Sequence, residues 1–224
     1  MTTPTPQGFA VAIDGPVGVG KSTTAKEVAS RLGMTYIDTG AMYRAIALYN
    51  LRLGNDRNNE QVIKATLPHI NITQNRQQIL LNGEDITQSI RTQEISEYTS
   101  VIASYGTVRD KLLAIQQELG AKGEVVMDGR DIASRILPWA QVKIYLDADA
   151  KERARRRAND LAAKGQPADI EQIYQETRIR DHRDITRAHS PLTKTHDAIL
   201  IDTTNLTMEE TIQKIITHVQ QARR

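Results

Sequence analysis

Short apolar runs alternate with longer segments of helical periodicity along most of the chain. Apolar runs bounded by turn residues predict buried strands, whereas apolar positions that recur every three or four residues predict amphipathic helices. Five strands are predicted in this way, at residues 9–13, 34–37, 124–127, 142–146 and 198–201. Helices are predicted at residues 23–32, 41–53, 60–67, 92–119 with a break near 105–106, 149–164, 168–188 and 207–222. Strands separated by helices predict an α/β fold, with a five-stranded parallel sheet covered by helices on both faces.

The segment from residue 69 to 87 departs from this pattern, because it holds three short runs in which apolar and polar residues alternate. The runs are residues 69–73, 77–81 and 84–87. Asn82-Gly83 stands between the last two runs, and Asn-Gly between alternating runs is a strong signal for a hairpin. The sequence therefore predicts a small antiparallel sheet inserted among helices.

The turn between the first predicted strand and helix, residues 15–22, matches the phosphate-binding pattern G-x-x-x-x-G-K-[ST]. In this arrangement backbone N–H groups curl around phosphate oxygens, and the helix N-terminus adds partial positive charge. Lys21 is expected to reach the β- and γ-phosphates, and the Ser22 hydroxyl is expected to bind Mg²⁺. The residues predicted to bind a nucleoside triphosphate are Gly15, Pro16, Val17, Gly18, Val19, Gly20, Lys21, Ser22 and Thr23.

Composition narrows the class of protein. The 224 residues suffice for one α/β domain with an insertion, and 39% hydrophobic residues suit a protein with a real core. A net charge of +2 is too balanced to argue for nucleic acid or an anionic membrane as a partner. The chain has no cysteine, which excludes disulfides and thiolate metal sites, and no stretch approaches the roughly 18 apolar residues of a membrane span. We expect a cytoplasmic monomer that acts on small molecules.

Aspartates follow the predicted strands, at Asp14, Asp38, Asp128, Asp147 and Asp202. In an open α/β sheet, ligands bind at the carboxyl ends of the strands, and carboxylates there suit Mg²⁺ coordination. Asp is also common at loop starts because it caps helices, which is the better explanation for Asp147 and Asp202 taken alone. Capping does not call for the arginine and the second acid in residues 128–131. We expect that motif to be functional, with Asp128 assisting Mg²⁺ through water.

Arginines form a second signal. Residues 151–190 are dense in Lys and Arg, and most of these side chains are expected to form surface ion pairs on a helical hairpin. Phosphoryl transfer, however, needs cations on the equatorial phosphate oxygens, and the arginine fork fits them. Arg153, Arg156 and Arg157 share one helix face by their spacing. That face is predicted to close over a triphosphate as a lid.

These motifs together closely resemble the bacterial cytidylate kinases. The resemblance is carried by residues 15–22, 38–44, 90–94, 128–131 and 180–192, and it extends from about residue 8 to 222. It implies transfer of the γ-phosphoryl group of ATP to CMP or dCMP, with Mg²⁺ as cofactor. It also implies a P-loop core at 8–39 and 99–224, a monophosphate-binding insertion at 40–98 that contains the small sheet, and a short helical lid within about 153–167.

Matched position by position, the resemblance assigns roles to individual residues. The implied CMP-binding residues are Thr39, Tyr43, Arg44, Ser100, Arg109, Arg130, Asp131, Arg180, Asp184 and Arg187. Among them, Ser100, Arg109 and Asp131 are similar to cytosine contacts, and Arg180 and Asp184 to sugar contacts. The residues that resemble the acceptor-phosphate group are Tyr43, Arg44, Arg130 and Arg187. The implied catalytic residues are Lys21, Arg130, Arg153, Arg157 and Arg187. Residue 39 is Thr where many relatives carry Ser, and both supply a hydroxyl.

Two alternatives follow from a phosphate-binding loop. A regulatory GTPase needs a D-x-x-G switch and an N-K-x-D guanine reader, and the chain contains neither. Another small-molecule kinase, acting on UMP and CMP, on shikimate or on dephospho-coenzyme A, is the closer alternative. The insertion at 69–87 and the second group of arginines argue against it.

Overall fold

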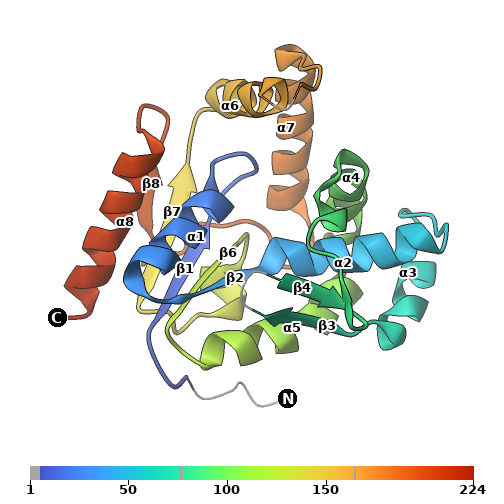
Figure 1. Cartoon of the computed structure of the whole chain (residues 1–224), viewed down its shortest axis with the longest axis horizontal. Helices are drawn as coiled ribbons and strands as arrows, with labels where there is room; N and C mark the ends of the chain where they lie inside the picture. The colour runs from blue at the N-terminus through green and yellow to red at the C-terminus, as the bar shows by residue number, and fades with distance from the viewer. Residues whose placement is uncertain (1–5, 76–77, 164) are drawn as a thin grey trace.

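Five parallel strands form the central sheet of the molecule (Figure 1). The computed structural model describes residues 6–75, 78–163 and 165–224. The strands are β1 (Ala10–Asp14), β2 (Thr35–Asp38), β6 (Val125–Gly129), β7 (Val142–Asp147) and β8 (Ile199–Asp202). Their order across the sheet is β2-β6-β1-β7-β8, and every neighbouring pair is parallel. This topology confirms the predicted α/β fold.

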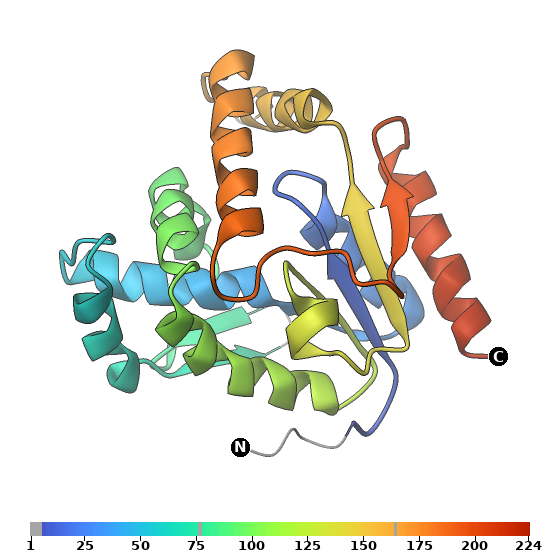
Figure 2. The same ribbon diagram turned by 180° about the vertical axis from the view of Figure 1, so that it is seen from behind.

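Helices cover both faces of the sheet (Figures 1 and 2). One face carries α1 (Lys21–Leu32) and α8 (Met208–Ala222), and the other carries α2 (Thr39–Arg52) and α5 (Gly106–Ala121). Because side chains alternate along a strand, β1 serves two cores. Val11 and Ile13 pack with α1 and α8, whereas Ala10 and Ala12 pack with α2 and α5. Burial on both faces explains why this strand is an unbroken apolar run in the sequence.

A small antiparallel sheet and short helices lie between α2 and α5 along the chain. They are α3 (Glu60–Thr66), η1 (Leu67–His69), β3 (Ile72–Asn75), β4 (Gln78–Leu81), β5 (Glu84–Asp85), η2 (Ser89–Arg91) and α4 (Gln93–Ile102). The strand order β3-β4-β5 confirms the predicted small sheet. Asn82 and Gly83 turn the chain between β4 and β5 with φ angles of 50° and 88°, as the Asn-Gly pair predicts.

The outer strands of the small sheet are shorter than predicted, for two local reasons. The run predicted from residue 69 becomes a strand only at Ile72, because Pro68 lies in the tight 3₁₀ turn η1 just before it. The last run stops at Asp85, because the Asp85 carboxylate accepts the N–H and the hydroxyl of Thr87 at 2.9 and 2.6 Å. Such an Asx turn bends the backbone out of the strand.

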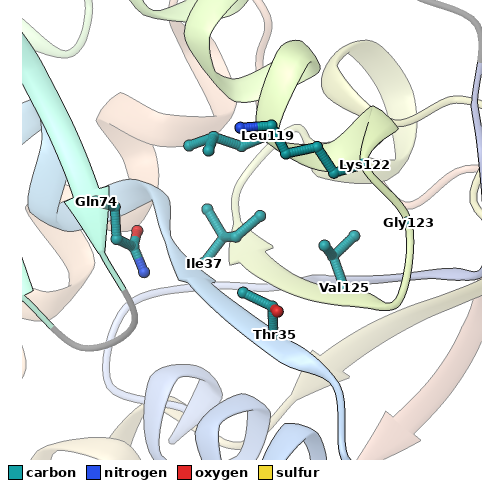
Figure 3. Close-up of a pocket in the computed structure, with 7 residues that line it drawn as sticks. All are labelled: Thr35, Ile37, Gln74, Leu119, Lys122, Gly123 and Val125. Atoms are coloured by element: carbon teal, nitrogen blue, oxygen red, sulfur yellow. The ribbon is translucent and has the colours of Figure 1, made fainter.

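One side chain attaches the small sheet to the free edge of β2. Gln74 Nε2 donates to the carbonyl of Tyr36 at 2.8 Å, and Gln74 Oε1 accepts the N–H of Asp38 at 3.2 Å. The amide therefore pairs with the edge strand as a peptide group would. Figure 3 shows Gln74 reaching from β3 toward β2 beside a cavity of about 80 Å³. This cavity is lined by Thr35, Ile37, Gln74, Leu119, Lys122, Gly123 and Val125, none of them a predicted site residue.

Two charged helices form a hairpin beyond the carboxyl ends of the strands (Figures 1 and 2). They are α6 (Ala150–Ala162) and α7 (Ile170–Thr186), close to the predicted positions, and a small core of Ala154, Ala158 and Ile173 joins them. Residues 77 and 164, at the ends of a predicted strand and a predicted helix, lie outside the described residues. Within the described ranges, no helix is both long and apolar enough to cross a membrane.

Candidate active site

The loop between β1 and α1 has a backbone conformation that depends on its glycines. Gly18 and Gly20 have φ angles of 77° and 89°, in the left-handed region that favours glycine. Gly15 has a φ of 151°, and a Cβ there would overlap the carbonyl oxygen of Leu146. Gly20 immediately precedes α1, so the loop ends at a helix N-terminus. The unpaired N–H groups and partial positive charge of that terminus favour an anion.

Lys21 is the first residue of α1 and is buried against the loop. Its ammonium group donates to the carbonyl oxygen of Pro16 at 2.5 Å, so the side chain folds back over the loop. Burial and then the nearby charge of Arg130 lower the pKa of Lys21, while neighbouring carboxylates oppose the shift. An anion bound in the loop would stabilise the charged ammonium. Lys21 is therefore placed where phosphate charge can be neutralised.

Asp128, near the end of β6, is held by hydroxyl groups from three elements. Its Oδ2 accepts the hydroxyl of Ser22 at 2.8 Å, and its Oδ1 accepts the hydroxyl of Tyr36 at 2.8 Å. Its backbone carbonyl accepts the hydroxyl of Thr39 at 2.6 Å. Burial and then the charge of Asp38 raise the pKa of Asp128. Two donors thus fix the carboxylate of Asp128 beside the start of α1, and a third holds its backbone.

The Ser22 hydroxyl and the Asp128 carboxylate are hard oxygen donors of the kind that Mg²⁺ prefers. In the part of the chain that the structure describes, no group of three or more His, Cys, Asp or Glu side chains is placed to hold a metal ion. This donor set fits an Mg²⁺ ion that is also bound by phosphate oxygens and water. It does not fit a metal held by protein side chains alone.

The other strand-end aspartates serve the backbone. Asp14 accepts two N–H groups at 2.9 and 2.8 Å from the start of η3 (Ile132–Ile136), a π-helical turn that the sequence does not predict. Burial raises the pKa of Asp14 to about 7. Asp147 and Asp202 each accept an N–H from one of the next two residues. The helix caps predicted at Asp147 and Asp202 are not found, because the N-caps of α6 and α8 are Asp149 and Thr207; Asp147 and Asp202 hold the backbone of the loops after their strands.

A buried ion pair lies among the residues that the sequence assigns to the acceptor. Arg109 on α5 donates through Nη2 to Asp131 Oδ2 at 2.5 Å, and both side chains are almost fully buried. The Arg109 guanidinium also lies over the ring of Tyr43, 5.4 Å from its centroid. Burial raises the pKa of Tyr43 to about 12, so its phenol is neutral near pH 7. A carboxylate that accepts and a guanidinium that donates are thus fixed side by side.

Asp184 on α7 joins two further arginines of the predicted acceptor site. It accepts from Arg130 Nε at 2.8 Å and from Arg187 Nη1 at 3.3 Å. Burial works against ionisation of Asp184, but the charges of Arg130 and Arg187 lower its pKa. Among the described residues, Arg187 Nη2 is buried without a hydrogen-bond partner, 4.0 Å from Asp131 Oδ1. A buried guanidinium nitrogen that lacks an acceptor suits an anionic ligand oxygen.

Helix α7 lies beside α4 (Figures 1 and 2), and two arginines of α7 reach that helix. Arg183 Nη1 donates to the Ser100 hydroxyl at 2.7 Å, and Arg180 Nη1 donates to the Ser96 hydroxyl at 3.3 Å. Burial and then neighbouring arginine charges lower the pKa of Arg180 to about 10. A guanidinium crowded by other cations gains from an added anion or hydroxyl acceptor.

Arg153 on α6 braces the phosphate-binding loop. It is buried, and its Nη1 donates to the carbonyl of Val17 at 2.8 Å and to Asp181 Oδ2 at 2.6 Å. Asp181 Oδ1 in turn accepts the N–H of Val17 at 3.1 Å. The α6–α7 hairpin is therefore linked to the loop through the backbone N–H and the carbonyl of Val17.

The other arginines of that helix face have different partners. Arg156 Nη2 donates to the carbonyl of Thr203 at 2.6 Å, in the segment after β8. Arg157 is exposed and reaches Gln93 of α4 at 3.5 Å. Arg44 lies 3.9 Å from Asp38, and burial lowers its pKa. Of the three α6 arginines predicted to act as one face, the structure places Arg153 alone against the loop.

Three residues of the site were not identified from the sequence: Tyr36, Asp181 and Arg183. Asp38 and Asp128 are partners in the β2–β6 register, so Tyr36 lies one pleat back along the edge strand. The sequence offered one signal for Tyr36: it is a hydroxyl residue in a predicted strand, and aspartates follow the predicted strands. Asp181 and Arg183 lie within the motif at 180–192, which could have drawn attention to them.

Known proteins resemble this chain along almost its whole length. The family model described as cytidylate kinase matches residues 11–221. A cytidylate kinase from Caldicellulosiruptor saccharolyticus is 47% identical, over 92% of this chain and 93% of its own. The cytidylate kinase from Anoxybacillus flavithermus is 44% identical, over 95% of this chain and 96% of its own. The one from Acholeplasma laidlawii is 43% identical, over 96% of this chain and 97% of its own. A gluconokinase structure from Sinorhizobium meliloti aligns with 99% of this chain and 94% of its own, at 13% identity and a TM-score of 0.46. The matches to the family model and to the three cytidylate kinases confirm the resemblance: the chain belongs to the cytidylate kinase family of phosphotransferases.

Proposed function

We propose that this protein transfers the γ-phosphoryl group of ATP to CMP or dCMP. The buried ion pair of Asp131 and Arg109 is the observation that supports a cytosine nucleotide as the substrate. Cytosine presents an amino donor at N4 and acceptors at N3 and O2, whereas uracil presents an acceptor at O4 and a donor at N3. A fixed carboxylate beside a guanidinium matches the cytosine pattern and opposes the uracil pattern. In this proposal the hydroxyl of Ser100 is a third contact to the base.

The loop at residues 15–23 holds the triphosphate of ATP in this proposal. The left-handed glycines and the start of α1 direct backbone N–H groups at phosphate oxygens, and Lys21 neutralises the β- and γ-phosphates. Ser22 would bind Mg²⁺ directly and Asp128 would bind it through water. When bound, Mg²⁺ neutralises charge on the phosphate oxygens. Arg153 keeps the loop in place through Val17.

The acceptor nucleotide lies along α7 and the end of β6. Tyr43, Arg44, Arg130 and Arg187 hold its phosphate, Arg180 and Asp184 hold the sugar, and Thr39 is a further residue of this binding site. The unpartnered Nη2 of Arg187 supports this placement, because an anionic oxygen there would satisfy a buried donor.

Transfer is direct and in line. The acceptor phosphate is already an anion, so no side-chain base is needed, and positioning and charge neutralisation carry the rate. Lys21, Arg130, Arg153, Arg157 and Arg187 supply that charge and alignment. We assign no covalent intermediate to the protein.

The proposal keeps the three-part division: a core at 8–39 and 99–224, an insertion at 40–98 and a lid within 153–167. Closing the insertion and lid together would exclude water from the γ-phosphoryl group. We propose a monomer that works in the cytoplasm without nucleic acid or membrane; the balanced net charge of +2 favours neither of these partners.

ADP release with seven acceptors offered in parallel tests this function. CMP, dCMP, UMP, AMP, GMP, shikimate and dephospho-coenzyme A would be compared at equal ATP and Mg²⁺. The proposal expects CMP and dCMP to give the highest kcat/KM. A higher value for any of the other five would overturn it.

A further inference from the structure

We propose that Tyr36 is a positioning residue for the magnesium–nucleotide site: its hydroxyl fixes the orientation in which the Asp128 carboxylate works together with Ser22. This inference rests on the proposed function, because it concerns how the chain binds the Mg²⁺ complex of ATP. Tyr36 is not proposed to bind Mg²⁺ or ATP itself; it contacts the Asp128 carboxylate, which belongs to that site.

The two oxygens of Asp128 each receive one hydroxyl, from two different elements. Ser22 Oγ on α1 donates to Oδ2 at 2.8 Å, and Tyr36 OH on β2 donates to Oδ1 at 2.8 Å. A carboxylate held at one oxygen can still turn about its Cβ–Cγ bond, whereas donors at both oxygens fix its plane. Each carboxylate oxygen has a second lone-pair site, so the fixed group can still accept from a metal-bound water.

Tyr36 is suited to this task because a tyrosine phenol is a neutral O–H donor at physiological pH. Its hydroxyl lies 2.8 Å from Asp128 Oδ1 and donates to it. The ring packs against the core on the α1 side of the sheet, which sets the position of the hydroxyl.

The surroundings of Asp128 give the phenol a specific function. Asp128 is buried, so its oxygens depend on hydrogen-bond donors from the protein. The hydroxyl donor at Oδ1 keeps Oδ2 turned toward Ser22. The tyrosine also borders a cavity of about 700 Å³ that includes Lys26 and Arg91. Without the hydroxyl, Oδ1 loses its donor, and the carboxylate plane is held only by the bond from Ser22 to Oδ2.

Tyr36→Phe removes the hydroxyl alone and keeps the ring in the core. Calorimetry would measure the affinity of the full chain for a non-hydrolysable ATP analogue, once with Mg²⁺ and once with EDTA. We expect the affinity in EDTA to stay within about twofold of the wild type. The gain in affinity on adding Mg²⁺ should fall about tenfold, the size of loss typical when a partner of a metal-binding group is removed. The KM for CMP should not change.

Tyr105→Phe is the matched control, because its hydroxyl donates to the backbone carbonyl of Arg57 at 2.8 Å, in a different part of the molecule. It should leave the Mg²⁺-dependent gain at the wild-type value. Combining Tyr36→Phe with Asp128→Asn adds a second measurement. If Tyr36 acts through Asp128, its substitution should cause no further loss in the Asp128→Asn background.

An unchanged Mg²⁺-dependent gain in Tyr36→Phe, or an equal loss in Tyr105→Phe, would overturn the role of Tyr36 while leaving the proposed function intact. Equal losses from Tyr36→Phe in the wild-type and Asp128→Asn backgrounds would also overturn it. Failure of the proposed function looks different, because the wild type itself would then phosphorylate CMP no better than the other acceptors.

Discussion

Arg183 on α7 and Ser100 on α4 are joined by a hydrogen bond of 2.7 Å between a guanidinium and a hydroxyl. Ser100 is proposed to contact the base of the acceptor nucleotide, whereas α7 belongs to the hairpin that links to the phosphate-binding loop. Gln93, Ser96 and Ser100 lie on one face of α4 by their spacing, and each accepts an arginine of α6 or α7. These three contacts, Arg157–Gln93, Arg180–Ser96 and Arg183–Ser100, form a polar seam between the ATP side and the CMP side of the molecule.

This seam predicts coupling between the two nucleotides. An ATP analogue should tighten CMP binding in the wild type, and Arg183→Met should reduce that coupling factor about fivefold because one contact across the seam is lost. Calorimetric titration of CMP with and without the analogue measures it. Arg178→Met is the control, since Arg178 lies on the same helix and stacks on Tyr174, 5.7 Å from the ring centroid. Equal coupling in all three proteins would refute the seam.

Lys21→Ala should lower kcat about 10³-fold while the fold stays intact, because the buried ammonium neutralises charge that moves during transfer. Steady-state kinetics with CMP measures the loss, and circular dichroism checks the fold. Lys26→Ala, one turn further along α1 and exposed, should stay within about twofold of the wild type. A Lys21→Ala enzyme that kept a tenth of wild-type turnover would remove Lys21 from the catalytic set.

Gly15→Ala should destabilise the protein much more than Gly33→Ala. Both glycines have φ angles outside the range that L-residues favour, 151° and 66°, but only at Gly15 would a Cβ overlap another atom, the carbonyl oxygen of Leu146. We expect a loss of about 1 kcal/mol for Gly33→Ala from backbone strain alone. The added clash at Gly15 should raise the loss to about 3 kcal/mol or more. Urea unfolding measures both, and equal losses would contradict the close approach.

The raised pKa of Asp14, about 7 against 3.8 for the free side chain, predicts a pH dependence of stability. Between about pH 4 and 7 the unfolded chain loses this proton before the folded chain does, so ionisation favours unfolding. Stability from this group is therefore highest below pH 4 and is lost as the pH rises to 7, by up to about 1.4 kcal/mol per pH unit.

Asp14→Asn removes that proton. The substitution should lower stability at every pH, because the amide offers one acceptor for two N–H groups of η3. It should also abolish the contribution of Asp14 to the slope of unfolding free energy against pH. Urea unfolding of both proteins at pH 4.5, 6, 7 and 8 checks this. Parallel curves for the two proteins would show that Asp14 does not titrate in this range.

Local signals predicted most of the fold. Apolar runs marked all five strands of the central sheet, and the Asn82-Gly83 turn marked the small sheet. The features that escaped prediction depend on partners far along the chain. The π-turn η3 is capped by Asp14 from 118 residues away, and Gln74 binds the edge of β2 from 36 and 38 residues away. No periodicity in a single segment reports such contacts.

The candidate site shows the same division. The loop at 15–22 and the motif at 128–131 could be predicted because their chemistry is written in consecutive residues. Tyr36 could not, because a tyrosine in an apolar strand is ordinary until the fold brings Asp128 beside it. The different partners of Arg153, Arg156 and Arg157 could not be predicted either, since helical spacing gives a shared face but not what that face meets.

If Asp131 recognises the cytosine base, its substitution should change the ratio of kcat/KM for CMP to that for UMP. The ratio would be measured in the wild type, Asp131→Ala and Ser100→Ala, with circular dichroism to verify folding. The wild type should favour CMP strongly. Asp131→Ala should narrow the ratio about 10²-fold, because the acceptor for the N4 amino group is lost while uracil loses an opposing charge. Ser100→Ala should narrow it less. A ratio that stays unchanged in both variants, with activity falling equally on CMP and UMP, would contradict the claim.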